Sequence, residues 1–410
     1  MIDMKTIEFQ KTNEIKVMRD VVHGYIHVDY QVVWDCINAK EFQRLRRIKQ
    51  LGGVYAVYHT AEHSRFTHSL GEYEIVRRMV SEIEGLAALS EYDKVTVMLA
   101  GLLHDIGHLP FSHASERLVN IAHEEFSQRV ILEDTEIHQI LVDVDPGLAQ
   151  AVADVIAYQH PNPLLNQIVS GQLDADRMDY LLRDSYMSGT SYGKFDLERI
   201  LRTIRIKENR IVVKESGIHS IEDYIMSRYH MYWQVYYHSI ARSYEAILNS
   251  IYKRMKFLYD HDFAKVEKLI MFHPFLRGNP SIYDHFVLDE HAADYGFGLA
   301  LHGEDPILSD LCERLLDRHL FEHERIEKQE DLERITQRVQ KAGYDPEYYV
   351  VDETTMKNPY SPYGSSDTHN IYILLENGEI KELSEVSVIV KSLVEGDIKK
   401  ERLVFYPSGI

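Results

Sequence analysis

The chain has 410 residues, of which 45% are hydrophobic and 27% are charged. This composition is typical of a globular protein with a sizeable core, and it excludes a disordered chain. The formal net charge of -20 argues against broad affinity for nucleic acid, because nonspecific binding depends on the neutralisation of phosphates by Lys and Arg. We therefore expect no nucleic-acid partner.

The lack of a recognisable targeting signal and the cysteine usage both predict a cytoplasmic protein. No N-terminal segment combines a basic start with an apolar run, so we expect no signal peptide. The longest apolar stretch, 95–103, is about half of a membrane span, and we expect no membrane association. Cys36 and Cys312 stand far apart and in no metal-ligand spacing, which predicts a reducing compartment.

Helical periodicity dominates the first two thirds of the chain. From Val95 the apolar residues recur at the spacing of an amphipathic helix, which Gly107 and Pro110 end. A second helix is predicted over 173–186, and a long one, rich in aromatics, over 221–259. A short hairpin is expected near 204–213.

The last part of the chain has a different residue pattern, which predicts strands. Asn377-Gly378 between the apolar runs 371–375 and 380–383 is a strong hairpin signal. Further strands are predicted over 348–351 and 402–406. Residues 358–366 are predicted to form a loop or linker.

We therefore predict a mainly α protein with two parts. Residues 1–325 form a helical catalytic domain, whose motifs fall within 16–260. Residues 326–410 form a smaller α+β region that contains the hairpin.

A group of histidines and aspartates carries the first chemical signal. His104 and Asp105 end an otherwise apolar helix, where an unpaired carboxylate is costly and the helix dipole disfavours negative charge. A divalent cation resolves both problems, and mixed imidazole and carboxylate ligands suit Mn, Fe, Ni, Zn or Co better than Mg. The alternative to a metal site is that this His-Asp pair occurs by chance at the protein surface. Asp176, Tyr180 and Asp184 share one helical face, which could likewise be merely solvated.

At this point the residues match a known family. The order His68, His104-Asp105, Asp176 resembles the metal-ligand set that names the HD superfamily. The segments 42–52, 63–71, 104–113 and 174–184 further resemble its deoxynucleoside triphosphate (dNTP) triphosphohydrolase branch. That branch includes bacterial dGTPases and the catalytic core of the human restriction factor with a sterile alpha motif.

The resemblance implies an all-helical HD catalytic core and a role for each matching residue. It implies one divalent metal ion per active site (Mn, Fe, Ni, Zn, Co or Mg), held by His68, His104, Asp105 and Asp176. The acid–base and leaving-group residues would be His108, His113, Glu116 and His123. The triphosphate would contact Arg65, Arg177 and Arg228, and the sugar and base would contact Gln50, Leu51, Tyr180, Asp184 and Tyr236.

The implied reaction is hydrolysis of dNTPs to a deoxynucleoside and triphosphate. Water activated by the metal attacks the α-phosphorus, and histidines move the protons. A tyrosine packed against the sugar, where a 2′-hydroxyl would collide, would explain a preference for deoxyribose. Arg177 stands where some relatives carry lysine, and either cation serves a phosphate.

The same branch implies a nucleotide-activated homotetramer. The positions that match its regulatory site for a guanine nucleotide or dNTP are Lys16, Val17, Asn38, Gln43, Arg46, Arg199 and Lys214. Asn38 replaces an aspartate that reads the guanine edge, and Ser216 replaces a lysine, which puts guanine specificity in doubt. A solvated helix face is the alternative explanation for Gln43 and Arg46.

Two other functions remain open. Another HD phosphohydrolase, such as a nucleoside monophosphatase, a cyclic-nucleotide phosphodiesterase or a (p)ppGpp hydrolase, would share the metal ligands. It would not need Gln50-Leu51, Arg228 and Tyr236 together. A nucleotide sensor without catalysis would be expected to have lost a ligand or a catalytic histidine, and here none is lost.

Overall fold

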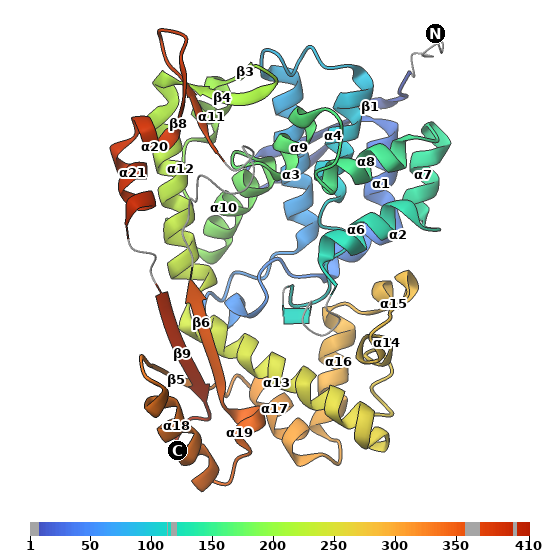
Figure 1. Ribbon diagram of the computed structural model, residues 1–410. Helices are drawn as coiled ribbons and strands as arrows, with labels where there is room; N and C mark the ends of the chain where they lie inside the picture. Colours follow the sequence, from blue (N-terminus) through green and yellow to red (C-terminus); the bar gives the residue numbers. More distant parts are fainter. Residues whose placement is uncertain (1–7, 113, 116–120, 357–369, 397–399) are drawn as a thin grey trace.

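The computed structural model describes residues 8–112, 114–115, 121–356, 370–396 and 400–410. These residues are mainly helical, as predicted, and form three small sheets (Figure 1). The core is continuous and draws buried apolar residues from Phe9 to Tyr406. None of the described helices has the length and hydropathy needed to cross a membrane.

The chain begins with an antiparallel hairpin that the sequence analysis did not predict, β1 (Lys11–Asp20) and β2 (Gly24–Tyr30). Charged residues interrupt the apolar alternation of β1, which hides its strand pattern. Gly24 allows the tight turn because its φ is +75°, in the left-handed region. The short helices that follow are α1 (Gln31–Asn38), α2 (Lys40–Arg44), η1 (Leu45–Arg47) and η2 (Gly53–Ala56).

Three helices form the centre of the catalytic part: α3 (Arg65–Glu82) packs against α4 (Glu91–Leu103) and α10 (Ala175–Ser188). The predicted helices from Val95 and over 173–186 are confirmed as α4 and α10. The side chain of Ser90 caps α4, and that of Asp174 caps α10. The helices that surround this centre are α6 (His123–Leu132), α7 (Glu136–Val144), α8 (Leu148–Ile156), α9 (Pro163–Ser170) and α11 (Leu197–Thr203).

The prediction of one long helix over 221–259 is wrong. The segment divides into α12 (Ile218–Met231), a π-helical turn η4 (Tyr232–Tyr236) and α13 (Ser239–His261). The side chain of His238 accepts a hydrogen bond from the backbone N–H of Ile240 at 3.2 Å and thereby starts a new helix. Tyr236 is the last residue of the π-helical turn, a feature that occurs frequently at functional sites.

The helices after α13 are η5 (Phe263–Lys265), α14 (His273–Arg277), α15 (Ile282–Val287), α16 (Glu290–Leu301) and α17 (Pro306–Leu316). They lie in the lower half of Figure 1, where η5, α14 and α17 contact α13. The C-terminal part adds α18 (Gln329–Lys341), α19 (Pro346–Tyr349), α20 (Leu383–Val386) and α21 (Val388–Glu395).

Two predicted hairpins are confirmed and share one sheet. The first consists of β3 (Ile204–Lys207) and β4 (Arg210–Lys214), followed by the short helix η3 (Glu215–Gly217). The second consists of β7 (Tyr372–Leu374) and β8 (Ile380–Glu382). The strand order is β3-β4-β7-β8, because β7 pairs with β4 in parallel.

The other C-terminal strands form a second sheet in the order β5-β9-β6. Its strands are β5 (Glu322–Arg325), β6 (Val351–Met356) and β9 (Lys400–Tyr406). The strand predicted over 402–406 is confirmed as β9. The one predicted over 348–351 begins only at its last residue, because Asp345 and Pro346 start α19 there. The predicted loop 358–366 lies outside the described residues, and the boundary near 325 stays a prediction.

Candidate active site

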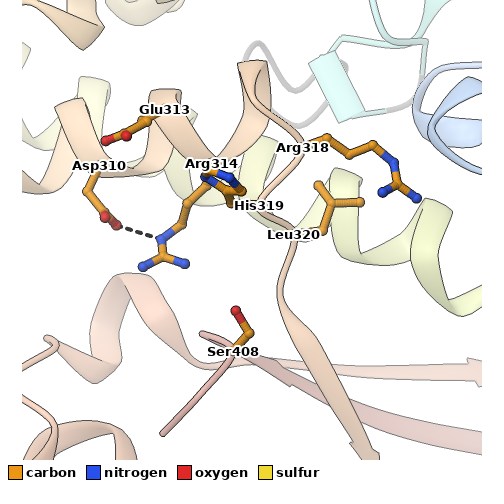
Figure 2. A pocket seen from close by; sticks show the side chains of 7 residues that line it. All are labelled: Asp310, Glu313, Arg314, Arg318, His319, Leu320 and Ser408. Atoms are coloured by element: carbon orange, nitrogen blue, oxygen red, sulfur yellow. Dashed lines mark hydrogen bonds and ion pairs between the residues drawn. The ribbon is translucent and has the colours of Figure 1, made fainter.

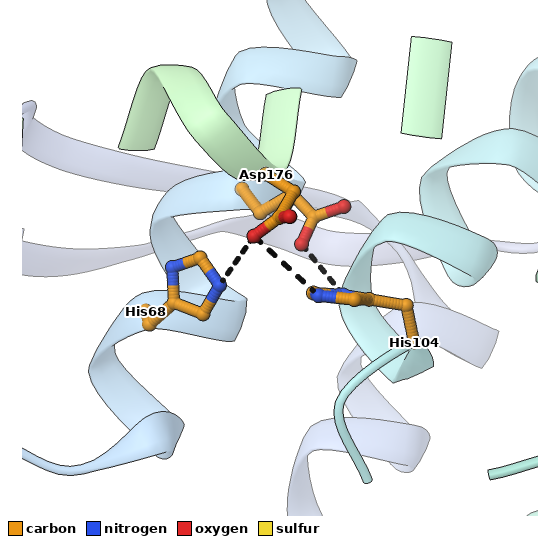
Figure 3. A group of neighbouring side chains, drawn as sticks. His68, His104 and Asp176 are labelled. Atoms are coloured by element: carbon orange, nitrogen blue, oxygen red, sulfur yellow. Dashed lines mark ion pairs between the residues drawn. The ribbon is translucent and has the colours of Figure 1, made fainter. Parts of the chain in front are cut away.

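The ends of three helices bring the first donor cluster together. His68 lies in the first turn of α3, and Asp176 is the second residue of α10. His104 follows α4 directly and precedes Asp105. His68 and Asp105 are buried, and His104 and Asp176 are partly exposed. Figure 3 shows the rings of His68 and His104 approaching Asp176 from two sides.

The donor atoms of this cluster are spaced as around one cation. Nε2 of His68 lies 3.1 Å from Oδ1 of Asp176 and 3.7 Å from Oδ2 of Asp105. Nε2 of His104 lies 3.1 Å from Oδ1 of Asp105 and 3.7 Å from Oδ1 of Asp176. Ligand atoms about 2.1 Å from a shared metal are roughly 3.0–3.4 Å apart, so these separations suit a common ion.

In both His68 and His104, the Nδ1 nitrogen contacts a buried carboxylate, while Nε2 faces the cluster. Nδ1 of His68 hydrogen-bonds to Oδ2 of Asp179 at 2.8 Å, and Nδ1 of His104 lies 2.6 Å from Oε2 of Glu72. Such partners fix the ring and leave Nε2 to bind a metal. The sequence analysis missed both carboxylates. No local signal could have found them, because each carboxylate comes from a different segment than the ring it contacts.

The electrostatics of the cluster favour a cation. Although burial opposes it, the hydrogen bonds that the ring donates to Asp176 and Asp179 raise the pKa of His68 to about 10. Burial raises the pKa of the Glu72 carboxyl to about 8. Nε2 of His68 is buried and lies within 3.7 Å of the carboxylates of both Asp105 and Asp176. Positive charge held beside crowded carboxylates fits a divalent metal ion, which would take the place of the ring proton, and the residues present supply its ligands.

A second group joins Asp105 to two of the predicted catalytic histidines. Nε2 of His108 lies 3.2 Å from Oδ1 of Asp105, and its ring stacks on that of His123 with centroids 3.7 Å apart. Burial and the charge of Arg65 hold the pKa of His108 well below its ordinary value, so the imidazole is neutral. A neutral imidazole can accept a proton. His113 and Glu116 lie outside the described residues.

The predicted phosphate-binding arginines fall in two places. Arg65 forms an ion pair with Asp105 and donates from Nη2 to Oγ of Ser112 at 2.9 Å. Arg177 pairs with Asp174, and Arg228 donates to Oε1 of Gln172 at 2.9 Å. The last two guanidinium groups therefore both contact the segment that precedes α10.

The predicted sugar and base residues extend from the cluster along α10. The ring centroid of Tyr180 lies 6.4 Å from that of His68 and 6.1 Å from that of Tyr236. The buried Asp184 accepts a hydrogen bond from the hydroxyl of Tyr236 at 2.8 Å. Its other oxygen lies 2.8 Å from Nε2 of His63, a contact that the sequence analysis missed.

The remaining two residues predicted for this region, Gln50 and Leu51, are also buried. The backbone N–H of Gln50 donates to the carbonyl of His63 at 2.9 Å, which ties it to the Asp184 group. The side-chain oxygen of Gln50 is buried without a hydrogen-bond partner among the described residues. This acceptor is therefore available to a ligand.

The predicted regulatory residues form separate groups. Gln43 donates to the carbonyl of Ile37 at 2.7 Å and accepts from Nε of Arg46 at 2.9 Å, beside Asn38 at the end of α1. Within the described residues, no hydrogen bond or ion pair links this group to the others. Lys16 and Val17 lie on β1, and Lys214 ends β4. Arg199 donates to the carbonyl of Ser216 at 2.9 Å.

A pocket of about 460 Å³ lies elsewhere, between α17 and the C-terminal end of the chain (Figure 2). Its lining residues are Asp310, Glu313, Arg314, Arg318, His319, Leu320 and Ser408. Nε of Arg314 donates to Asp310 at 2.7 Å, and its Nη2 donates to the hydroxyl of Tyr344 at 3.0 Å. The donor group beside this pocket, Glu313, Asp317 and His319, is exposed, whereas the His/Asp cluster is buried or partly buried, so we place the active site at the His/Asp cluster.

Comparison with known proteins identifies the family. A family model described as HD domain matches residues 65–184, and one described as HD associated region matches 195–272. The uncharacterized protein YwfO of Bacillus subtilis is 45% identical over 407 residues, which cover 98% of this chain and 94% of that protein. The crystal structure of a phosphohydrolase from Bacteroides thetaiotaomicron superposes with a TM-score of 0.84 at 28% identity, covering 96% of this chain and all of that one.

Similarity to dNTP triphosphohydrolases is more distant and partial. Human deoxynucleoside triphosphate triphosphohydrolase SAMHD1 is 28% identical over 278 residues, which are 58% of this chain and 44% of that protein.

Fold and donor set define a helical protein with a His/carboxylate cluster, suited to a divalent metal, at the ends of three helices. The chain belongs to the HD-domain family. By family, fold and cluster it is an HD-domain phosphohydrolase.

Proposed function

We propose that this phosphohydrolase converts dNTPs to deoxynucleosides and triphosphate. One observation carries the proposal: the aromatic and carboxylate group of Tyr180, Asp184 and Tyr236 is continuous with the His/Asp cluster through the ring of His68. A nucleoside bound along α10 would then present its α-phosphate to the cluster. The partial similarity to SAMHD1 supports the same substrate class.

The four residues His68, His104, Asp105 and Asp176 would hold the metal ion, with Glu72 and Asp179 orienting the two rings. A bound divalent metal supplies Lewis-acid activation of water and neutralises charge on the phosphoryl oxygens.

The chain's own groups perform the remaining steps. Arg65 lies against Asp105, so it would bind a phosphoryl oxygen beside the cluster. Arg177 and Arg228 would bind the outer phosphates. The neutral imidazole of His108 would take a proton from the attacking water, and the stacked His123 would pass a proton to the leaving 5′-oxygen. His113 and Glu116 remain candidates for protonating the leaving 5′-oxygen.

Regulation is a separate proposal. We infer that a guanine nucleotide or dNTP binds where Lys16, Val17, Asn38, Gln43 and Arg46 of one chain meet the Arg199 and Lys214 region of another. The proposal is supported by the match of these positions to the regulatory site of the dNTP triphosphohydrolase branch, and a homotetramer would join residues that lie on different elements of one chain. Light scattering with and without dGTP tests it.

The deciding experiment is hydrolysis of each dNTP with Mn²⁺ or Mg²⁺, alone and in mixtures, with products separated by ion exchange. Release of deoxynucleoside plus triphosphate establishes attack at the α-phosphorus. Turnover that appears only in mixtures establishes nucleotide activation. If no dNTP is hydrolysed under any of these conditions while a monophosphate or cyclic nucleotide is, the proposal is wrong and another HD activity takes its place. An Asp176→Asn variant that loses turnover provides the control for contaminating phosphatases.

A further inference from the structure

The turn of the β1–β2 hairpin directs its polar side chains into the protein. Oδ1 of Asp20 accepts the backbone N–H groups of Val22 at 2.8 Å and of His23 at 2.9 Å, which closes the turn. The side chains of Asp20 and His23 are only 8% and 4% exposed. By contrast, Ile15 and Val17 of β1 are more than half exposed. The turn therefore anchors the end of β1, whose Ile15 and Val17 stand open to solvent.

The anchor point is Asp179, a fully buried carboxylate on α10. Nε2 of His23 lies 2.6 Å from its Oδ1, and Nε and Nη2 of Arg183 each donate to it at 2.8 Å. Nη1 of Arg183 donates in turn to Oδ2 of Asp20 at 2.7 Å. The hairpin turn thus reaches Asp179 directly through His23 and indirectly through Asp20 and Arg183.

The same carboxylate orients a ring of the His/Asp cluster. Its Oδ2 accepts from Nδ1 of His68 at 2.8 Å. Because an ionised carboxylate only accepts hydrogen bonds, Nδ1 of His68 donates its proton to Asp179. Nε2, the ring nitrogen left for a metal, faces Asp105 and Asp176. The position of Asp179 therefore decides where the metal-binding nitrogen points.

We propose that His23 and Asp20 are positioning residues that fix His68 through Asp179, so that the β1–β2 hairpin turn is part of the metal centre and controls its affinity. The inference rests on the proposed function only in taking the His/Asp cluster as a metal site. It deepens that function because Lys16 and Val17 lie on the same hairpin, three to four residues before Asp20. A displacement of the hairpin by anything bound there would reach His68 through two hydrogen bonds.

The test is the affinity of the full chain for Mn²⁺, measured without substrate from the free-ion electron paramagnetic resonance signal. His23→Leu removes the donor to Asp179, and His23→Gln restores a donor near the position of Nε2. His27→Leu is the matched control, because His27 lies on β2 of the same hairpin and contacts Glu74 instead. Loss of such outer partners weakens metal binding about 10- to 100-fold. We expect about 10-fold weaker binding for His23→Leu, and near-wild-type binding for the other two.

Wild-type affinity in His23→Leu would overturn the proposal, as would equal weakening in His23→Leu and His23→Gln, which would indicate packing alone. If His23→Leu does not fold, Asp20→Asn replaces it. This variant keeps the acceptor that closes the turn and removes the charge that holds Arg183, and unchanged affinity in it would again overturn the proposal. Failure of dNTP hydrolysis with the expected Mn²⁺ affinities would reject the proposed substrate and leave this inference standing.

Discussion

Gly71 and Asp179 lie so close together that no side chain fits between them. A Cβ placed on Gly71 would overlap Oδ1 of Asp179 and Nη2 of Arg183. Gly71 stands three residues after His68 on α3, so the bare backbone at this position admits the buried carboxylate that orients His68. The glycine thus serves close approach rather than backbone flexibility.

The first prediction follows from this contact. Gly71→Ala should destabilise the protein by about 1–3 kcal/mol, because overpacking displaces Asp179 and outweighs the helix propensity gained. Gly298 lies in α16 with open space around its missing Cβ, so Gly298→Ala should stabilise by up to about 1 kcal/mol. Chemical denaturation of the metal-free protein measures both. Equal effects of the two substitutions would refute the packing argument.

The second prediction concerns the partner of His104. Glu72→Gln should weaken Mn²⁺ binding by about 10- to 100-fold, because the charged carboxylate that lies 2.6 Å from Nδ1 of the ring is lost. Glu74→Gln is the control: Glu74 is buried on the same helix but pairs with Arg77. Isothermal titration with Mn²⁺ compares the two. An unchanged affinity in Glu72→Gln would mean that the backbone alone orients His104.

The third prediction separates two roles of Tyr236. Tyr236→Phe removes a donor to the buried carboxylate of Asp184, and we expect kcat/KM for dNTPs to fall about 10- to 100-fold. The ratio of dNTP to ribonucleotide turnover should persist, because the ring that would exclude a 2′-hydroxyl remains. Tyr236→Ala should reduce that ratio. Tyr229→Phe, on the preceding helix α12, should leave both quantities unchanged. An unchanged ratio in Tyr236→Ala would assign sugar discrimination to another residue.

The fourth prediction concerns pH and Glu290. This buried carboxylate accepts the backbone N–H of Lys49 at 2.9 Å and of Phe111 at 3.2 Å, and burial raises its pKa to about 7. Because the folded state binds this proton more tightly than the unfolded state, the proton stabilises the fold fully below the unfolded pKa. That stability is lost as the pH rises through about 7.

Glu290→Gln keeps the accepting oxygen and cannot ionise. Urea denaturation gives the free energy of unfolding of the wild type and of this variant. The wild-type value minus the variant value should decline by up to about 3 kcal/mol between pH 5 and pH 8. A constant difference across this range would show that Glu290 titrates at its ordinary pKa in the fold.

Local patterns were sufficient to predict the elements that carry the first donor cluster. Apolar spacing places α4 before His104 and Asp105, and Asp174 caps the helix that carries Asp176. Each of these features depends on residues a few positions apart, because helical periodicity and capping are local. The Asn377-Gly378 turn is predictable for the same reason.

Only the tertiary structure decides which carboxylates stand behind the histidines. Glu72 and Asp179 look like ordinary polar positions on their helices, and their burial depends on where α3, α4 and α10 meet. The contact of His23 with Asp179 spans 156 residues, and the π-helical break before Tyr237 depends on packing. Periodicity within one segment carries no information about such partners, because burial and hydrogen bonding between distant segments arise only when the whole core assembles.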